Sequence, residues 1–191
     1  MSQEEKKRFL KNLTVLIDTR EQKNQHIKTA LQNMGIPFEV RKLDFGDYSF
    51  TAQGRDFSLL CVVERKANPE EFYSNITFDR ERIEKEVRAA TSIANQFILL
   101  IENVTNEKTL KNYTIPDEEF NRFGSKRRVQ DIGYQCYSTI KSWECGSRYN
   151  FKTLYVKDNQ NTAKEIVETF YWWWHNYKKL TASRRNREGG A

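Results

Sequence analysis

The chain has 191 residues, of which 30% are charged and 38% hydrophobic, and its formal net charge is +6. This length suits one ordinary α/β domain, and the apolar and aromatic content excludes a fully disordered chain. The longest apolar runs, 59–63 and 97–101, fall far short of the roughly 20 residues that a membrane-spanning helix needs, so no such helix is expected.

The charge and the cysteine content indicate an intracellular protein with a polyanionic partner. Basic proteins favour nucleic acid, the commonest polyanion in cells. The three cysteines and two histidines have no zinc-type spacing, which argues against a zinc site or a disulfide scaffold. Residues 1–7 contain no apolar core for a signal peptide. We expect a soluble protein that makes no membrane contact, cytoplasmic and nucleoid-associated if prokaryotic or phage-encoded, and nuclear if eukaryotic.

Hydrophobic periodicity predicts alternating strands and helices. Strands are expected at 13–17, 37–43, 48–50, 57–63, 97–101 and 151–156. Helices are expected at 22–34, 69–90 with room for a break near Phe78, 126–143 and 163–180, while 105–123 is polar and irregular. Asn68 is a suitable N-cap, with Pro69 at the first helical position and Glu71 completing a capping box. The alternation predicts one α/β domain over 1–180, with a mixed central sheet flanked by helices. A flexible basic tail would follow at 181–191.

Carboxylates gather at the ends of the predicted strands. Asp18 follows the first strand and Glu21 comes three residues later, Asp47 opens another strand, and Glu64 lies at the end of a third. Acids at strand ends can converge on one point, and oxygen ligands suit Mg²⁺ or Mn²⁺. Lys66 lies two residues after Glu64, so both side chains would point to one face of the strand and Arg65 to the other.

Such a site suits hydrolysis of phosphodiester bonds. A divalent metal polarises the phosphoryl oxygens and lowers the pKa of a bound water. Lys66 could orient that water and stabilise charge on the scissile phosphate. An acid followed by Glu-x-Lys is the signature of restriction-enzyme-like nucleases.

Three longer segments give a more specific resemblance. They are Ile17-Asp18-Thr19-Arg20-Glu21, the segment 40–48 ending in Phe45-Gly46-Asp47-Tyr48, and Val62-Val63-Glu64-Arg65-Lys66. The chain closely resembles the XPF family of structure-specific DNA endonucleases, whose hallmark is Gly-Asp, a gap, and Glu-Arg-Lys-x-x-x-Asp. Residues 46–47 and 64–66 match this hallmark, and Leu99-Leu100-Ile101-Glu102 resembles the strand that follows it. The resemblance extends over about residues 13–175.

The resemblance implies a restriction-endonuclease-like fold and a set of site residues. It implies that the divalent ion is bound by Asp18, Glu21, Asp47 and Glu64. Lys66 would be the catalytic lysine, with Arg65 and Arg20 in supporting roles. Glu70 stands where the hallmark has Asp, which leaves its role open, and the family's arginine on the following helix falls on Arg80 or Arg82.

Two further features bear on partners. Lys126, Arg127 and Arg128 cluster at the start of a predicted helix, where contact with the DNA backbone and plain solvation both fit. Near the C-terminus, Phe170, Trp173, Trp174 and Tyr177 lie at helical spacing. An apolar stripe of this width favours core packing or a subunit interface over base stacking, and a homodimer is expected.

We therefore expect a metal-dependent DNA endonuclease that acts on branched, flapped or forked DNA. The helix-hairpin-helix module common in the family is not expected, because eleven residues follow Leu180. The chain would then be a stand-alone nuclease or a piece of a longer one, and a recruiting protein could supply DNA targeting. The alternatives are a catalytically silent DNA-binding or partner subunit and a nuclease acting on ordinary duplex or RNA.

Overall fold

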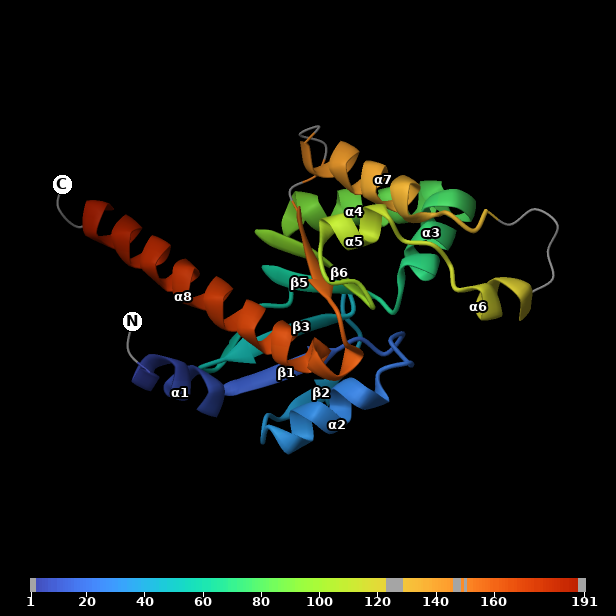
Figure 1. The fold of residues 1–191 in the computed structure, drawn as a ribbon. Helices are drawn as coiled ribbons and strands as arrows, with labels where there is room; N and C mark the ends of the chain where they lie inside the picture. Colours follow the sequence, from blue (N-terminus) through green and yellow to red (C-terminus); the bar gives the residue numbers. More distant parts are fainter. Residues whose placement is uncertain (1–2, 123–128, 146–148, 150, 189–191) are drawn as a thin grey trace.

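The computed structural model describes residues 3–122, 129–145, 149 and 151–188. A mixed sheet with seven strands forms its centre (Figure 1), in the order β2-β1-β3-β5-β6-β7, with β4 paired to β3. The strands are β1 (Leu13–Ile17), β2 (Phe38–Val40), β3 (Tyr48–Ala52), β4 (Arg55–Asp56), β5 (Cys61–Lys66), β6 (Gln96–Glu102) and β7 (Phe151–Val156). β1 runs parallel to β2 and antiparallel to β3, which is in turn antiparallel to β5. β5, β6 and β7 are mutually parallel. The expected mixed sheet is confirmed.

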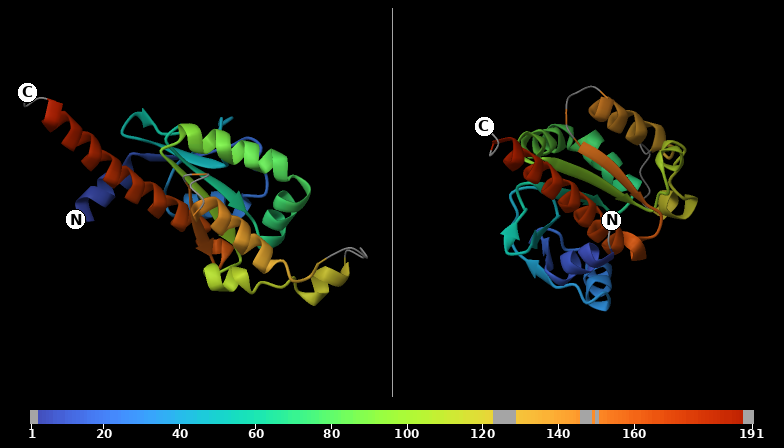
Figure 2. Two further views of the ribbon diagram at one scale, coloured as in Figure 1. Left: turned by 90° about the horizontal axis from the view of Figure 1, so that it is seen from above. Right: turned by 90° about the vertical axis from the view of Figure 1, so that its left-hand side faces the viewer.

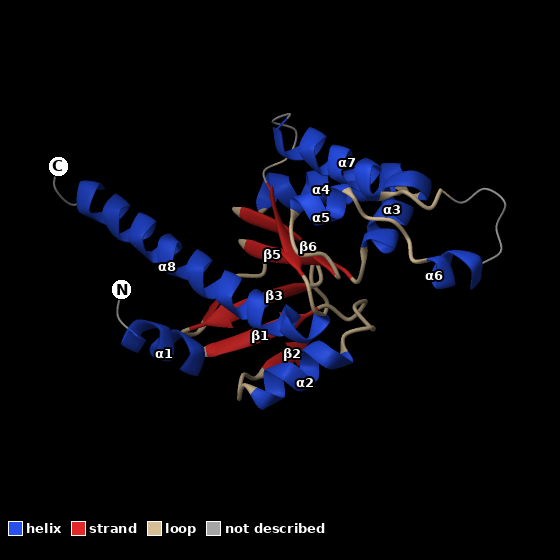
Figure 3. Ribbon diagram, viewed as in Figure 1, coloured by secondary structure: helices blue, strands red, loops and turns tan. Residues whose placement is uncertain are grey.

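Helices cover both faces of this sheet (Figure 3). They are α1 (Gln3–Lys11), α2 (Gln25–Asn33), α3 (Pro69–Phe78), α4 (Arg80–Ile93), α5 (Glu107–Lys111), α6 (Asp117–Arg122), α7 (Gly133–Cys145), η1 (Asn159–Asn161) and α8 (Thr162–Glu188). One core contains Phe9 of α1, Leu31 of α2 and Phe170 of α8. The other contains Phe72 of α3, Val87 of α4 and Trp143 of α7.

The two cores divide the strands by alternate residues, as a pleated strand requires. In β5, Cys61 and Val63 belong to the first core, whereas Val62 belongs to the second. In β6, Ile98 and Leu100 belong to the first core, and their neighbours in the strand to the second. This alternation decides which way the polar residues at the ends of β5 and β6 point.

The predicted N-cap, capping box and break of the helical segment between β5 and β6 are confirmed. Asn68 caps α3, because its Oδ1 accepts a hydrogen bond from the Glu71 backbone N–H at 2.8 Å. Glu71 returns a bond by accepting from the Ala67 N–H at 2.9 Å, one residue before the cap. The helical segment breaks at Asp79, which ends α3 and precedes α4.

Several boundaries differ from the sequence prediction for identifiable reasons. β5 begins at Cys61 rather than Phe57, because Asp56 accepts from the Ser58 N–H at 2.7 Å and turns the chain. α7 begins at Gly133 rather than at residue 126, because the backbone before it pairs with another segment: the Ile115 N–H donates to the Gln130 carbonyl at 2.9 Å. The stretch predicted to be irregular contains α5, capped by Asn106, and α6.

The two ends of the chain are also more helical than expected. α1 was not predicted, although Phe9 places it firmly in the first core. The tail was expected to be flexible from Thr181, but α8 continues as far as Glu188. Residues 181–188 contain no glycine or proline that would end the helix. The left view in Figure 2 shows the C-terminal part of α8 extending beyond the sheet.

The aromatic stripe on α8 packs mainly into the first core, as one of the two expected arrangements requires. Phe170 is fully buried and stacks on Phe50 with ring centroids 4.7 Å apart, and Trp174 is 3% exposed. Trp173 and Tyr177 are partly buried against the same core. Across the part of the chain that the structure describes, no helix is both long and apolar enough to span a bilayer.

Candidate active site

Asp47 is fixed at the start of β3 by its own backbone and by Gly46. The Asp47 N–H donates to the Val63 carbonyl at 2.8 Å, and the Asp47 carbonyl accepts from the Asp18 N–H at 2.8 Å. Gly46 has φ +66°, and a Cβ there would lie 3.0 Å from the Val63 carbonyl oxygen. Glycine thus permits both the left-handed backbone and the close approach of β5. These contacts join the ends of β1, β3 and β5 around Asp47.

Glu64 and Lys66 lie together on one face of β5, as the strand alternation predicts. The Lys66 ammonium donates to Glu64 Oε1 at 2.8 Å, and both side chains are largely buried. Burial alone would lower the pKa of Lys66, but the charges of Glu64, Asp47 and Glu71 raise it above its ordinary value. Lys66 is therefore a cation at neutral pH.

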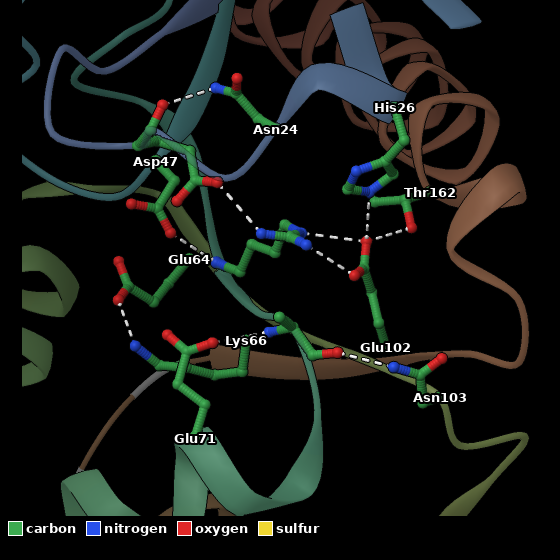
Figure 4. A network of polar contacts seen from close by, with 12 residues as sticks. Asn24, His26, Asp47, Glu64, Lys66, Glu71, Glu102, Asn103 and Thr162 are labelled. Carbon is green, nitrogen blue, oxygen red and sulfur yellow. Dashed lines mark hydrogen bonds and ion pairs between the residues drawn. The ribbon is translucent and has the colours of Figure 1, made fainter.

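Asp47 and Glu64 form an acid pair beside this cation. Burial raises the pKa of Asp47 well above its ordinary value, and repulsion from Glu64 raises it further, against a hydrogen bond from the Arg65 N–H. Figure 4 shows Asp47, Glu64, Lys66 and Glu71 on one side of the view. A divalent cation placed between the two carboxylates would relieve the repulsion that disfavours ionisation of Asp47.

Arg65 points to the opposite face of β5, and its side chain is 5% exposed. Its Nε and one terminal nitrogen donate to the two carboxylate oxygens of Glu102 at 2.9 and 2.7 Å. Its other terminal nitrogen donates to Glu21 Oε1 at 3.0 Å. Arg65 was expected to support catalysis. Among the described residues, its hydrogen bonds to the predicted metal ligands are the one from its backbone N–H to Asp47 and the one from its side chain to Glu21.

The Asp18 carboxylate is engaged in local structure. It is fully buried, and its Oδ1 accepts from the backbone N–H and the Nε of Arg20 at 2.8 and 2.6 Å. Its Oδ2 accepts from the Leu43 N–H at 2.6 Å. Burial would raise the pKa of Asp18, but these bonds lower it. Asp18 thus joins the turn after β1 to the loop before β3, and Arg20 serves as its partner.

The other predicted site residues either have partners outside the acid pair or lie outside the described residues. Glu70 accepts from the Tyr113 hydroxyl at 2.7 Å, so it ties α3 to the segment after α5. Arg80 and Arg82 pair with Glu84 and Glu86 on the exposed surface of α4. Lys126, Arg127 and Arg128 lie outside the described residues.

The structure adds polar residues that were not assigned to the site. Glu71 acts electrostatically on Lys66 and Glu21, although the sequence suggested only a capping role for it. Glu102, His26 and Thr162 form one connected group with Arg65. The sequence signal for this group was an acid, Glu102, directly after a buried apolar run.

The carboxylate oxygens of Asp47, Glu64 and Glu21 are ligands of the kind that suits Mg²⁺ or Mn²⁺. Among the described residues, no three His, Cys, Asp or Glu side chains are arranged as a ready-made metal cage. Mg²⁺ does not require one, because it is usually held by one or two carboxylates and completes its shell with waters and substrate phosphates. The mutually repelling carboxylates of Asp47 and Glu64 match that pattern, and one oxygen of Glu21 is left over from its bond to Arg65.

A family model matches most of the chain. The family model described as "ERCC4 domain" matches residues 17–169, most of the chain and all of the strand ends described above. The chain belongs to the ERCC4 domain family. The expected relationship to XPF-type proteins is confirmed.

Two solved structures have a fold similar to that of this chain. XPF from Aeropyrum pernix is 18% identical, with a TM-score of 0.55, and the match covers 82% of this chain and 64% of that one. XPF from the same organism in complex with DNA is 18% identical, with a TM-score of 0.58 and coverage of 85% and 65%. This chain thus spans somewhat less than two thirds of those proteins. No curated protein matches it in sequence.

Proposed function

We propose that the chain is a DNA endonuclease that uses Mg²⁺ or Mn²⁺ to hydrolyse phosphodiester bonds. The observation that carries the proposal is the half-buried acid pair of Asp47 and Glu64, which lies beside the Lys66 cation where β3 and β5 meet. Membership of the ERCC4 domain family supports it. The intact acids and Lys66 argue against a catalytically silent subunit.

Each residue of the site has a role that follows from its surroundings. Asp47 and Glu64 would hold the divalent ion, with Glu21 as a third oxygen donor. When bound, the ion supplies a Lewis acid for the phosphoryl oxygens and a water of lowered pKa. Lys66 is held as a cation by Glu64 and can stabilise negative charge on the scissile phosphate. Because its pKa is raised, Lys66 is suited to electrostatic stabilisation and not to accepting a proton.

The proposed substrate is branched, flapped or forked DNA. One of the similar solved structures is an XPF protein in complex with DNA, and the net charge of +6 on this chain favours a polyanion. Contacts limited to phosphates would make binding sensitive to salt and poor in sequence discrimination. A restriction-like nuclease acting on ordinary duplex or on RNA is the alternative that the assay below must separate.

The proposal includes a second copy of the chain as partner. The outer side of α8 carries apolar residues without cover, since Trp172 is 45% exposed and Leu180 is 65% exposed. Both residues line a groove of about 860 Å³ that β7 closes on the other side. Light scattering in solution measures the subunit count: two copies are expected, and a monomer at micromolar concentration would exclude this partner.

A cleavage assay tests the activity directly. The chain is incubated with Mg²⁺ and labelled flap, fork, duplex and RNA substrates, and with a chelator in parallel. We expect cleavage of the flap or fork, loss of cleavage with chelator, and loss of cleavage in Glu64→Gln. Glu86→Gln on α4, which changes a carboxylate whose side chain is 50% exposed, is the matched control and should remain active. Cleavage that resists the chelator would contradict the proposal.

A further inference from the structure

Glu102 lies at the end of β6, on the face of the sheet opposite to the acid pair, and is 1% exposed. Its two carboxylate oxygens receive four donors: two nitrogens of Arg65, Nε2 of His26 at 3.2 Å, and the Thr162 hydroxyl. Burial would raise the pKa of Glu102, but bonds from these partners lower it, so the residue is an anion at neutral pH. Figure 4 shows Glu102, His26 and Thr162 together, away from Asp47 and Glu64.

Arg65 is the only link between this group and the proposed metal ligands among the hydrogen bonds of the described residues. Its guanidinium makes two bonds to Glu102 and a single bond to Glu21. A buried arginine must be neutralised, and an anion that takes two of its donors satisfies most of that demand. Glu102 therefore limits how strongly Arg65 binds Glu21.

We propose that Glu102 is a positioning residue, which holds Arg65 so that Glu21 keeps one carboxylate oxygen for a divalent cation. This inference rests on the proposed function, because it assigns the device that keeps a ligand of that same site available. Without Glu102, the uncompensated Arg65 guanidinium would bind both carboxylate oxygens of Glu21. Glu21 would then have no oxygen free for a cation beside Asp47 and Glu64. His26 of α2 and Thr162 of α8 fix the orientation of Glu102 from the two helices packed over it.

The test measures Mn²⁺ binding by calorimetry alongside cleavage. Glu102→Gln keeps the shape of the side chain and removes its charge. We expect the Kd for Mn²⁺ to rise by about 10-fold or more, as for other partners of metal ligands, with a fall in kcat and little change in KM for DNA. Glu144→Gln is the matched control, because Glu144 also accepts from a threonine, Thr153, at 2.8 Å but lies on α7, away from the site.

A second variant separates positioning from general loss of structure. In Arg65→Met combined with Glu102→Leu, both charges are absent and Glu21 has no competitor. We expect the Kd for Mn²⁺ to return to within about 2-fold of the unmodified chain, although the double variant removes more interactions than Glu102→Gln alone. This variant also provides the test if Glu102→Gln fails to fold.

The outcomes distinguish the two proposals. If the unmodified chain neither binds Mn²⁺ nor cuts DNA, the proposed function fails. If the unmodified chain does both and Glu102→Gln binds Mn²⁺ equally well, the role of Glu102 is overturned. A double variant that binds Mn²⁺ more weakly than Glu102→Gln overturns it as well, because a structural role alone would produce that order.

Discussion

The backbone N–H of Arg65 donates to the Asp47 carboxylate at 2.8 Å, while the Arg65 side chain leaves by the opposite face of the sheet. One residue thus fixes an acid on the first face through its main chain and a buried ion pair on the second through its guanidinium. The acid pair is consequently sensitive to anything that moves β5 against β3. Gly46 allows these two strands to approach each other, so a substitution there should affect the position of the acid pair.

Gly46→Ala should destabilise the protein more than Gly35→Ala. Both glycines have φ +66°, so each substitution carries the left-handed strain of roughly 1–2 kcal/mol. A Cβ at residue 46 would also lie 3.0 Å from the Val63 carbonyl oxygen, whereas nothing lies within 4 Å at residue 35. Urea unfolding of both variants measures the difference, which we expect to reach ~1 kcal/mol or more. Equal losses would mean that β5 moves freely away from Gly46.

Asp47→Asn should stabilise the metal-free protein at pH 7. Burial and repulsion from Glu64 raise the pKa of Asp47 in the folded state, so its ionisation weakens folding as the pH rises above the unfolded pKa of about 3.9. The amide oxygen can still accept from the Arg65 N–H. Asp56→Asn is the control of opposite sign, because bonds from Ser58 and Arg41 lower the pKa of Asp56 despite its partial burial. Thermal melting with a chelator present should rise for the first variant and fall for the second.

Glu102→Gln should cost stability in a pH-dependent way. The folded-state pKa of Glu102 is lowered, so its contribution is present above the unfolded pKa of about 4.3 and is lost as the pH falls through the folded pKa. Breaking a buried ion pair on one side costs about 3–5 kcal/mol at neutral pH. Unfolding by urea at pH 7 and pH 3 compares the variant with the unmodified chain. The loss should shrink in acid, and a constant loss would rule out the charge as its source.

The sequence predicted the acid pair and Lys66 because these depend on local rules. A strand end after an apolar run places Glu64, alternation assigns Lys66 to the same face, and Gly46 marks the approach to Asp47. The group around Glu102 could not be predicted in this way. It requires β5 and β6 to be parallel neighbours, so that Arg65 and Glu102 share a face, and it requires α2 and α8 to lie over that face.

The same distinction explains the errors at the ends of the elements. The sequence prediction placed the start of the helix over 126–143 too early. A β-bridge between Thr114 and Asp131 engages the backbone just before Gly133, and no local sequence signal indicates this pairing.

Asp18 shows that the hydrogen-bond partners of a single residue can also be beyond what the sequence predicts. Its place at a strand end was correctly identified, and its oxygens accept from the Leu43 N–H and from Arg20, while its role as a metal ligand stays a prediction. Nothing near Asp18 in the sequence indicates that Leu43 is a partner.

The aromatic residues of α8 allow a test of core packing against base stacking. Trp173 packs edge-on against Phe57 at 5.5 Å and stacks on Tyr177 at 5.0 Å, whereas its neighbour Trp172 is 45% exposed. Trp173→Ser should therefore lower the free energy of unfolding by about 3 kcal/mol. This value is at the lower end of the losses measured when core aromatic side chains are truncated, because the Trp173 ring is only partly buried. At concentrations where the chain is monomeric, Trp172→Ser is the matched control and should change the free energy of unfolding by about 0.5 kcal/mol or less.

Thermal melting and DNA binding of the two tryptophan variants decide between the roles. If Trp173 serves the core, the folded fraction of Trp173→Ser should bind DNA as tightly as the unmodified chain below its lowered melting temperature. A base-stacking role predicts the reverse, an unchanged melting temperature with binding weaker by about 1–3 kcal/mol for the lost stack. The contacts of Trp173 with Phe57 and Tyr177 use its ring within the protein, so we expect the loss to fall on folding.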